Sequence, residues 1–188
     1  MLAAVGTQLD VLSVTDGEAS HPGGSVGPEQ LAPLREAETA RALAALGVPA
    51  MTQRLRLPDG GREELEQPVV DALQLEPGTW LLGPWQGDGH PDHEAVGRAC
   101  ATAAIRDGAR LLAYPVWAWH WARPHDERVP WARAAQVHLP RDIKHAKARA
   151  VAEFVSQVRP LGPLPEDAPV LAPHILERFA RPYEVVLT

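Results

Sequence analysis

The stretch of residues 87–94, Gly-Asp-Gly-His-Pro-Asp-His-Glu, holds the side chains best suited to chemistry. An imidazole nitrogen can bind a divalent metal ion, and a neighbouring carboxylate can fix the tautomer and orientation of a second imidazole. Because the glycines and the proline predict a loop, His90 and His93 need not aim at one point. One ring could bind a metal ion while the other faces a substrate. The alternative is a turn in which Asp92 only caps a helix that starts near His93.

Regular elements are expected on both sides of this loop. The apolar run 79–85 predicts a buried strand, and residues 94–104 predict a helix. In open α/β sheets, ligands bind at the carboxyl ends of the strands. The loop therefore has the position expected of an active site.

Aromatic side chains gather farther along the chain. Four of the six tryptophans lie between residues 117 and 131, where a strand expected over 110–119 ends. Indole faces beside polar groups suit a carbohydrate ligand. Trp119 or Trp121 is the predicted platform for a sugar ring, with His120 as a polar contact. The alternative is packing in the core or a lid, which is expected for at least half of these tryptophans.

Length and composition are those of one globular domain. The chain has 188 residues, of which 45% are hydrophobic and 22% charged, and its net charge is -6. A nucleic-acid surface would need a basic patch, so no nucleic-acid partner is expected. No apolar stretch approaches the roughly 18 residues that span a bilayer, and the first twelve residues do not resemble a signal peptide. The expected location is the cytoplasm.

Several segments, in this order, resemble the zinc-dependent N-acetylglucosaminyl de-N-acetylases, the PIG-L or LmbE-like family. The resemblance extends over nearly the whole chain and is carried by residues 12–22, 35–38, 46–48, 58–60, 89–93 and 181–185. It implies the α/β class: a single Rossmann-like, three-layer α/β/α domain over residues 1–188 with a mostly parallel sheet.

The resemblance also implies roles for individual residues. His93 matches the family's zinc ligand. His90, oriented by Asp92, matches the histidine that stabilises the oxyanion or protonates the leaving amine. Arg35 matches an arginine that contacts the substrate, although spacing alone equally allows a surface ion pair with Glu38. The implied reaction hydrolyses the acetamide of an N-acetylated amino sugar or glycoconjugate to acetate and a free amine.

One part of the family pattern is absent from this chain. Family members begin with a strand and a His-Pro-Asp-Asp-Glu-like loop, which supplies two zinc ligands and a general base. Residues 1–6 match the end of the helix that follows this loop, so one of three expected protein ligands is present. Either the native protein carries the loop upstream and is a working enzyme, or the chain is an inactive relative that retains a carbohydrate-binding fold. A truncated sheet would expose an edge, which predicts a homo-oligomer.

Overall fold

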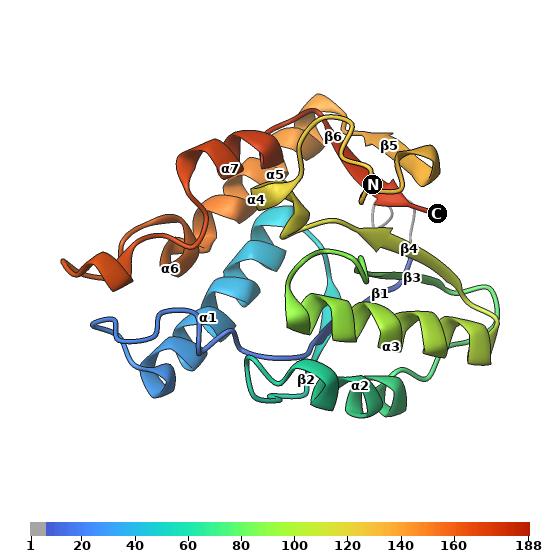
Figure 1. Cartoon of the computed structure of the whole chain (residues 1–188), viewed down its shortest axis with the longest axis horizontal. Helices are drawn as coiled ribbons and strands as arrows, with labels where there is room; N and C mark the ends of the chain where they lie inside the picture. The colour runs from blue at the N-terminus through green and yellow to red at the C-terminus, as the bar shows by residue number, and fades with distance from the viewer. Residues whose placement is uncertain (1–6) are drawn as a thin grey trace. The chain divides into compact units, whose positions relative to one another are not determined.

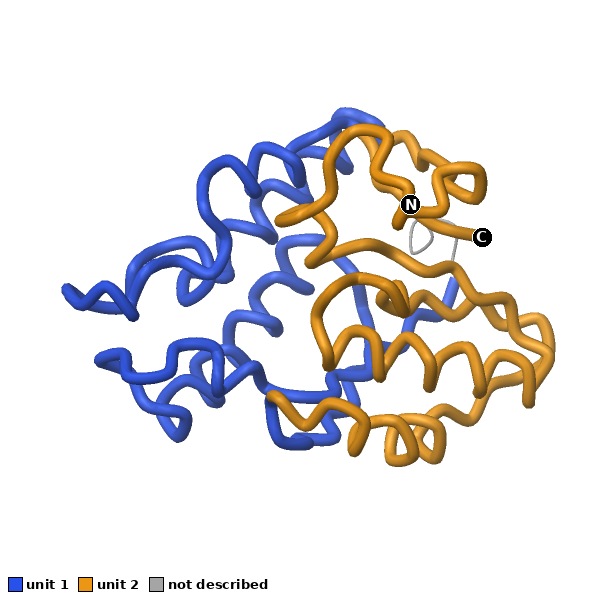
Figure 2. Tube along the Cα trace, viewed as in Figure 1, with its two compact units in different colours: residues 1–59, 139–182 blue, residues 60–138, 183–188 orange. Residues whose placement is uncertain are grey.

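The computed structural model describes residues 7–188, which form two compact units (Figure 2). Unit 1 contains residues 7–59 and 139–182, and unit 2 contains residues 60–138 and 183–188. Residues 1–6, predicted to end a helix, lie outside the described residues. The α/β class predicted from the sequence is confirmed, because both units combine helices with strands. That the whole chain is one domain stays a prediction.

Unit 1 contains a two-stranded parallel sheet. Strand β1 (Leu9–Ser13) pairs along its length with β2 (Ala50–Arg54). Helix α1 (Pro28–Leu46) connects them (Figure 1) and is capped at its carboxyl end by Gly47, whose φ of 67° is a left-handed conformation that glycine adopts without strain. Parallel strands need such a crossover, because a short turn cannot return the chain to the same direction.

Four further helical segments complete unit 1. Helix α5 (Arg141–Glu153) packs along α1, and the short helix α6 (Val155–Val158) follows it and also contacts α1. The 3-10 turn η4 (Pro165–Asp167) and helix α7 (Pro173–Phe179) come next. The end of α5 and the start of α6 therefore lie against the helix that carries Arg35.

Unit 2 is built on a four-stranded sheet with the order β3-β4-β6-β5. Strand β3 (Trp80–Pro84) runs parallel to β4 (Arg110–Tyr114). Strand β6 (Tyr183–Leu187) runs antiparallel to β4 and to β5 (Ala134–His138), so this sheet is mixed. The strand expected over residues 110–119 ends early, at Tyr114.

Helices cover this sheet and follow its strands. The crossover from β3 to β4 is α3 (Pro91–Asp107), which packs on both strands. The 3-10 turn η2 (Arg62–Leu65) and helix α2 (Glu66–Ala72) pack against α3. Helix α4 (Ala118–Trp121) follows β4, where the sequence predicted that the strand would continue to residue 119. The 3-10 turn η3 (Trp131–Arg133) precedes β5.

Small side chains allow α3 to lie close to β3. A Cβ on Gly97 would lie 2.7 Å from the carbonyl oxygen of Pro84, and a Cβ on Gly83 would lie 2.7 Å from Sγ of Cys100. Cys100 is buried, and burial raises the pKa of its thiol to about 11. This tight packing fixes the first turn of α3 at the carboxyl end of β3. Within residues 7–188, no helix is both long enough and apolar enough to cross a membrane.

Candidate active site

The two histidines singled out by the sequence lie at the carboxyl end of β3, as predicted. Helix α3 begins at Pro91, earlier than expected, and His90 occupies the N-cap position with φ −115° and ψ 123°. Proline suits the first helical position, because the N–H that it lacks would have no partner within the helix. His93 therefore belongs to the first turn of α3. The structure brings the two imidazoles together, with ring centroids 4.4 Å apart and planes inclined by 27°.

Asp88 holds His93, and sequence reasoning does not single it out for this role. Its fully buried carboxylate accepts a hydrogen bond from Nδ1 of His93 at 2.6 Å. It also accepts the backbone N–H groups of Val116, Trp117 and Ala118 at 2.8, 2.7 and 2.9 Å. Burial alone would raise the pKa of Asp88, but these hydrogen bonds bring it below its ordinary value. Asp88 is therefore a charged carboxylate that fixes the orientation of His93.

The hydrogen bond from Nδ1 also decides which nitrogen of His93 is available. In a neutral imidazole one nitrogen carries the proton and the other is an acceptor. With the proton on Nδ1 and directed at Asp88, Nε2 presents its lone pair, and the side chain is 29% exposed. Metal-binding histidines commonly have this arrangement, in which the second ring nitrogen donates to a carboxylate.

Aromatic rings continue from the histidines toward α4. The indole of Trp117 lies at 5.4 Å from the His90 ring, edge to face at 72°. The ring of His120 stacks on the indole of Trp117, with centroids 4.1 Å apart and an interplanar angle of 21°. His93, His90, Trp117 and His120 therefore form a continuous row of rings. The sequence predicted His120 for this site but did not single out Trp117. Trp119 is half-buried and lies on α4.

Trp121, the other candidate for a sugar platform, supports the loop that precedes α3. Its indole N–H donates to the carbonyl of Asp88 at 2.8 Å, and the guanidinium of Arg128 covers its ring at 4.2 Å. A Cβ on Gly89 would lie 2.5 Å from Nε1 of Trp121, and Gly89 has a φ of 81°. Only glycine can meet both conditions without strain. The interactions of Trp121 are thus those of a packing residue.

Asp92 anchors a turn and does not cap the helix. Its two carboxylate oxygens accept the backbone N–H groups of Gly60 and Arg62 at 2.7 and 2.9 Å, and it is buried. The alternative reading of Asp92 as the N-cap of α3 is wrong, because His90 holds that position. Asp92 joins the turn at residues 60–62 to the first turn of α3. That it orients His90 stays a prediction.

Arg35 belongs to a buried polar cluster in unit 1 and not to a surface ion pair. Its guanidinium donates to the carbonyl of Gly17 at 2.6 Å, to Oγ of Ser20 at 2.8 Å and to Oγ of Ser156 at 3.3 Å. Ser156 in turn donates through Oγ and its backbone N–H to the carboxylate of Glu38, at 2.6 and 2.8 Å. Burial lowers the pKa of Arg35. Arg35 therefore ties the loop after β1 to α1 and α6.

The family model for PIG-L, GlcNAc-PI de-N-acetylase, matches residues 1–104. This chain belongs to the PIG-L family. The matched part includes Arg35, Asp88, His90, Asp92 and His93, and it confirms the resemblance on which their roles were predicted. Among curated proteins, no match was found.

Solved structures show that the PIG-L chain shares its fold with deacetylases. The zinc inhibited form of teicoplanin deacetylase Orf2 has a TM-score of 0.67 at 18% identity and covers 99% of this chain and 88% of its own. The A40926 pseudoaglycone deacetylase Dbv21 has a TM-score of 0.63 at 20% identity, with coverage of 98% and 86%. A triple mutant of a deacetylase of teicoplanin biosynthesis, Orf2*T, has a TM-score of 0.62 at 20% identity, with coverage of 83% and 73%. At such identities the likeness concerns the fold.

The fit of a zinc ion can be judged from the donor atoms. His93 has the chemistry of a zinc ligand, because Nε2 is available and Asp88 supports the ring from behind. Residues 7–188 contain no group of three or more His, Cys, Asp or Glu side chains placed to hold a metal ion. The described part of this PIG-L chain therefore supplies one fitting ligand and does not by itself complete a site.

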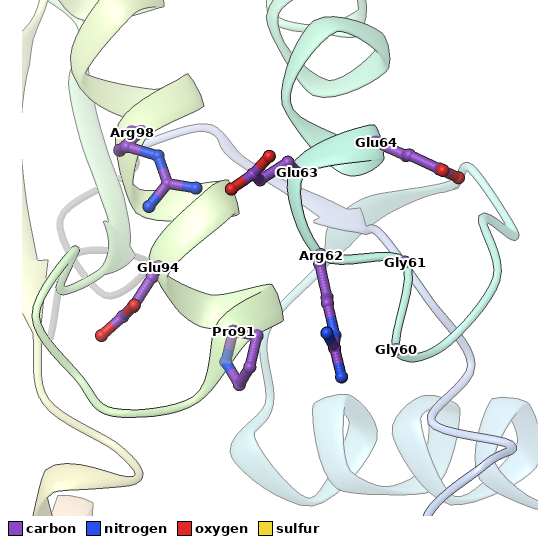
Figure 3. Close-up of a pocket in the computed structure, with 8 residues that line it drawn as sticks. All are labelled: Gly60, Gly61, Arg62, Glu63, Glu64, Pro91, Glu94 and Arg98. Carbon is purple, nitrogen blue, oxygen red and sulfur yellow. The ribbon is translucent and has the colours of Figure 1, made fainter.

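A pocket of about 520 Å³ lies beside the first turn of α3 in unit 2 (Figure 3). One wall is formed by residues 60–64, which lead into η2 and form its first turn, and the other wall is one side of α3. The lining residues are Gly60, Gly61, Arg62, Glu63, Glu64, Pro91, Glu94 and Arg98. Two of them, Pro91 and Glu94, directly follow His90 and His93 in the sequence, so the pocket adjoins the candidate active site.

Proposed function

We propose that this PIG-L protein is a zinc-dependent hydrolase that removes the acetyl group from an N-acetylglucosaminyl-type substrate. The reaction breaks the amide C–N bond with water and gives acetate and a free amine. The observation that carries the proposal is the Asp88–His93 pair, placed beside His90 at the carboxyl end of β3. Membership of a de-N-acetylase family supports the choice of reaction.

His93 is assigned the role of metal ligand. Its ring is fixed by the bond to a charged, buried carboxylate, so that Nε2 can bind a cation without reorientation of the side chain. A carboxylate behind the imidazole also makes the ligand more basic. Because the described residues provide no complete metal site, the remaining roles are assigned to side chains alone.

His90 is assigned the role of hydrogen-bond donor to the reacting group. Hydrolysis of an amide places negative charge on the carbonyl oxygen and needs a proton on the leaving nitrogen. An imidazole at a helix N-cap, held between His93 and Trp117, is fixed in position for either task. Asp92 contributes by holding the neighbouring turn in place.

The substrate is proposed to be an N-acetylated amino sugar, free or within a glycoconjugate. The aromatic row that ends at His120, with Trp119 on the same helix, offers the kind of surface on which a sugar ring can stack. Arg35 is retained as a substrate-binding residue on the family resemblance. The names teicoplanin deacetylase and A40926 pseudoaglycone deacetylase support removal of an acetyl group from a complex substrate.

A second candidate function is carbohydrate binding without catalysis. The specific observation in its favour is that residues 7–188 contain no complete set of metal ligands. In that case the row of rings would bind a sugar, and no acetate would be released.

Zinc content and acetate release, measured on the same samples, distinguish the two candidates. The samples are the purified chain, His93→Ala and a control, His145→Ala, which removes an exposed histidine of α5 in unit 1. If the chain is the proposed enzyme, zinc is near-stoichiometric, acetate is released from N-acetylglucosamine derivatives, and only His93→Ala loses both. Sugar binding without zinc or acetate would support the second candidate and overturn the first.

A further inference from the structure

The pocket beside α3 is lined by two arginines and three glutamates, and two of these five side chains, Arg98 and Glu94, make hydrogen bonds. Arg98 donates from Nε to Glu66 at 2.7 Å, and its Nη2 lies 2.5 Å from the same carboxylate oxygen. Glu94 accepts the backbone N–H of Gly89 at 3.0 Å. In Figure 3, Glu63 points toward Arg98, and Glu64 points away from the other lining side chains. These interactions leave one cation of the pocket to be accounted for.

That cation is Arg62. Among residues 7–188, its guanidinium makes no side-chain hydrogen bond or ion pair, and the residue is exposed. Figure 3 shows the side chain extending on the Pro91 side of the pocket, away from the Arg98 and Glu63 side. A guanidinium has a planar fork of N–H donors that matches a carboxylate or phosphate. The pocket therefore presents a cationic group with unused donors.

The backbone holds Arg62 in place in an unusual conformation. Its φ is 52°, a left-handed value that is uncommon for residues other than glycine. The bonds from the Gly60 and Arg62 amides to the buried carboxylate of Asp92 maintain this turn. The base of the Arg62 side chain is thus attached to the same helical turn that carries His93.

Helix geometry places the pocket next to the catalytic candidates. Successive residues of an α-helix are rotated by about 100° around its axis. The pocket residues Pro91 and Glu94 each follow one position after His90 and His93, so the two pairs occupy adjacent sides of the first turn. A substrate whose acetamide lies at the histidines can extend a substituent around this turn into the pocket.

We propose that this pocket is a subsite for an anionic substituent of the substrate, a carboxylate or a phosphate, and that Arg62 binds it. The proposal rests on the proposed function, because it names a chemical feature of that same substrate. Arg62 is then a specificity-determining residue: it favours charged amino sugars over neutral ones and takes no part in amide hydrolysis.

Two matched pairs of compounds test this proposal. N-acetylmuramic acid is compared with its neutral methyl ester, and N-acetylglucosamine 6-phosphate with N-acetylglucosamine. The proteins are the full chain, Arg62→Gln, Arg62→Lys and a control, Arg110→Gln, which removes an exposed arginine at the amino end of β4. The readouts are kcat/KM for acetate release and NMR shifts of the Gly60 and Gly61 amides during titration with each compound.

The chain is expected to prefer the charged member of at least one pair by about tenfold, the value of one charge-assisted hydrogen bond at an exposed site. Arg62→Gln should abolish this preference by lowering kcat/KM for the charged member, Arg62→Lys should retain part of the preference, and Arg110→Gln should retain all of it. The pair that shows the preference identifies carboxylate or phosphate. Equal kcat/KM values in the unmodified chain, or a preference that survives in Arg62→Gln, would overturn the proposal.

The NMR titration separates this proposal from the proposed function. If no compound releases acetate, the proposed function fails, but saturable shifts at Gly60 and Gly61 with charged compounds only, lost in Arg62→Gln, would still support the subsite. If acetate is released and these amides respond equally to charged and neutral compounds, the subsite fails and the proposed function stands. Without acetate release and without shifts at these amides, both are overturned.

Discussion

Nδ1 of His93 lies 2.6 Å from a carboxylate oxygen of Asp88, and this hydrogen bond links the partly exposed ring to a fully buried charge. Asp88 also accepts three amides from the chain that follows β4. One carboxylate thus joins the loop after β3, the first turn of α3 and the start of α4. The orientation of His93 is therefore coupled to the packing of the whole carboxyl edge of the β3–β4 pair.

Replacing Asp88 by Asn should weaken metal binding without removing the ligand. Asn is similar in shape but neutral, so it supports the His93 ring less strongly. Loss of a partner of this kind typically costs about 10- to 100-fold in metal affinity. Zinc affinity measured by competition with a chelator checks this, with Asp142→Asn as the control, because Asp142 is an exposed residue of α5 in unit 1. An unchanged affinity in Asp88→Asn would show that the pair has no part in metal binding.

Asp88 should also contribute to the pH dependence of stability. Hydrogen bonds hold its pKa in the folded protein below the ordinary value. Its contribution is therefore complete above the unfolded pKa of about 3.9 and is lost as the pH falls through the lower folded pKa. Urea unfolding between neutral and acidic pH should show a smaller loss of stability for Asp88→Asn than for the unmodified chain. An equal loss of stability between neutral and acidic pH in the two proteins would contradict this expectation.

Asp92→Asn should loosen the turn at residues 60–62. The amide group of Asn has one acceptor oxygen, so it cannot replace both carboxylate oxygens that now accept from Gly60 and Arg62. Hydrogen exchange of these two amides should become about tenfold faster or more, since a lost bond to a charged group is worth roughly 1.5 to 3 kcal/mol. Exchange at Leu73, whose amide donates to Val69, serves as the internal control. Unchanged exchange at Gly60 and Arg62 would exclude an anchoring role.

The sequence predicts the position of the site better than the partners within it. Residues 87–94 could be placed between a strand and a helix because glycine, proline and the apolar run 79–85 mark the element ends. The pairing of Asp88 with His93 could not be predicted, because the other partners of Asp88 are backbone amides of residues 116–118. Backbone donors are present at every residue except proline and leave no signal in the sequence.

The same reason explains the error in the strand expected over residues 110–119. Its apolar and aromatic residues suit a strand, but the amides of Val116, Trp117 and Ala118 bond Asp88, and helix α4 follows. Tertiary contacts with one buried carboxylate override the local preference. The buried Arg35–Ser156–Glu38 cluster was likewise hidden, because the serine lies far along the chain from the two charged residues.

Ser156→Ala should destabilise unit 1. The hydroxyl accepts from Arg35 and donates to Glu38, and all three side chains are buried. Its removal leaves a donor and a charged acceptor without this partner, at a cost of about 1 to 3 kcal/mol in the free energy of unfolding. Urea unfolding measures the change, and Thr102→Ala, at an exposed residue of α3, should change it by less than about 0.5 kcal/mol. Equal effects of the two substitutions would rule out the bridging role.

Gly97→Ala should destabilise unit 2, opposite to the usual effect in a helix. Alanine in place of a helical glycine normally stabilises by roughly 0.5 to 1 kcal/mol. Here the new Cβ would lie 2.7 Å from the carbonyl oxygen of Pro84 and 2.8 Å from the backbone nitrogen of Gln86, so α3 must move away from β3. Because the first turn of α3 carries His93, zinc affinity should fall together with the free energy of unfolding.

Gly47→Ala is the control, because a Cβ there meets no atom within 4 Å. The cost of this substitution comes from the φ of 67° alone, and zinc affinity should not change. A more stable Gly97→Ala protein with unchanged zinc affinity would show that the approach of α3 to β3 does not set the geometry of the site.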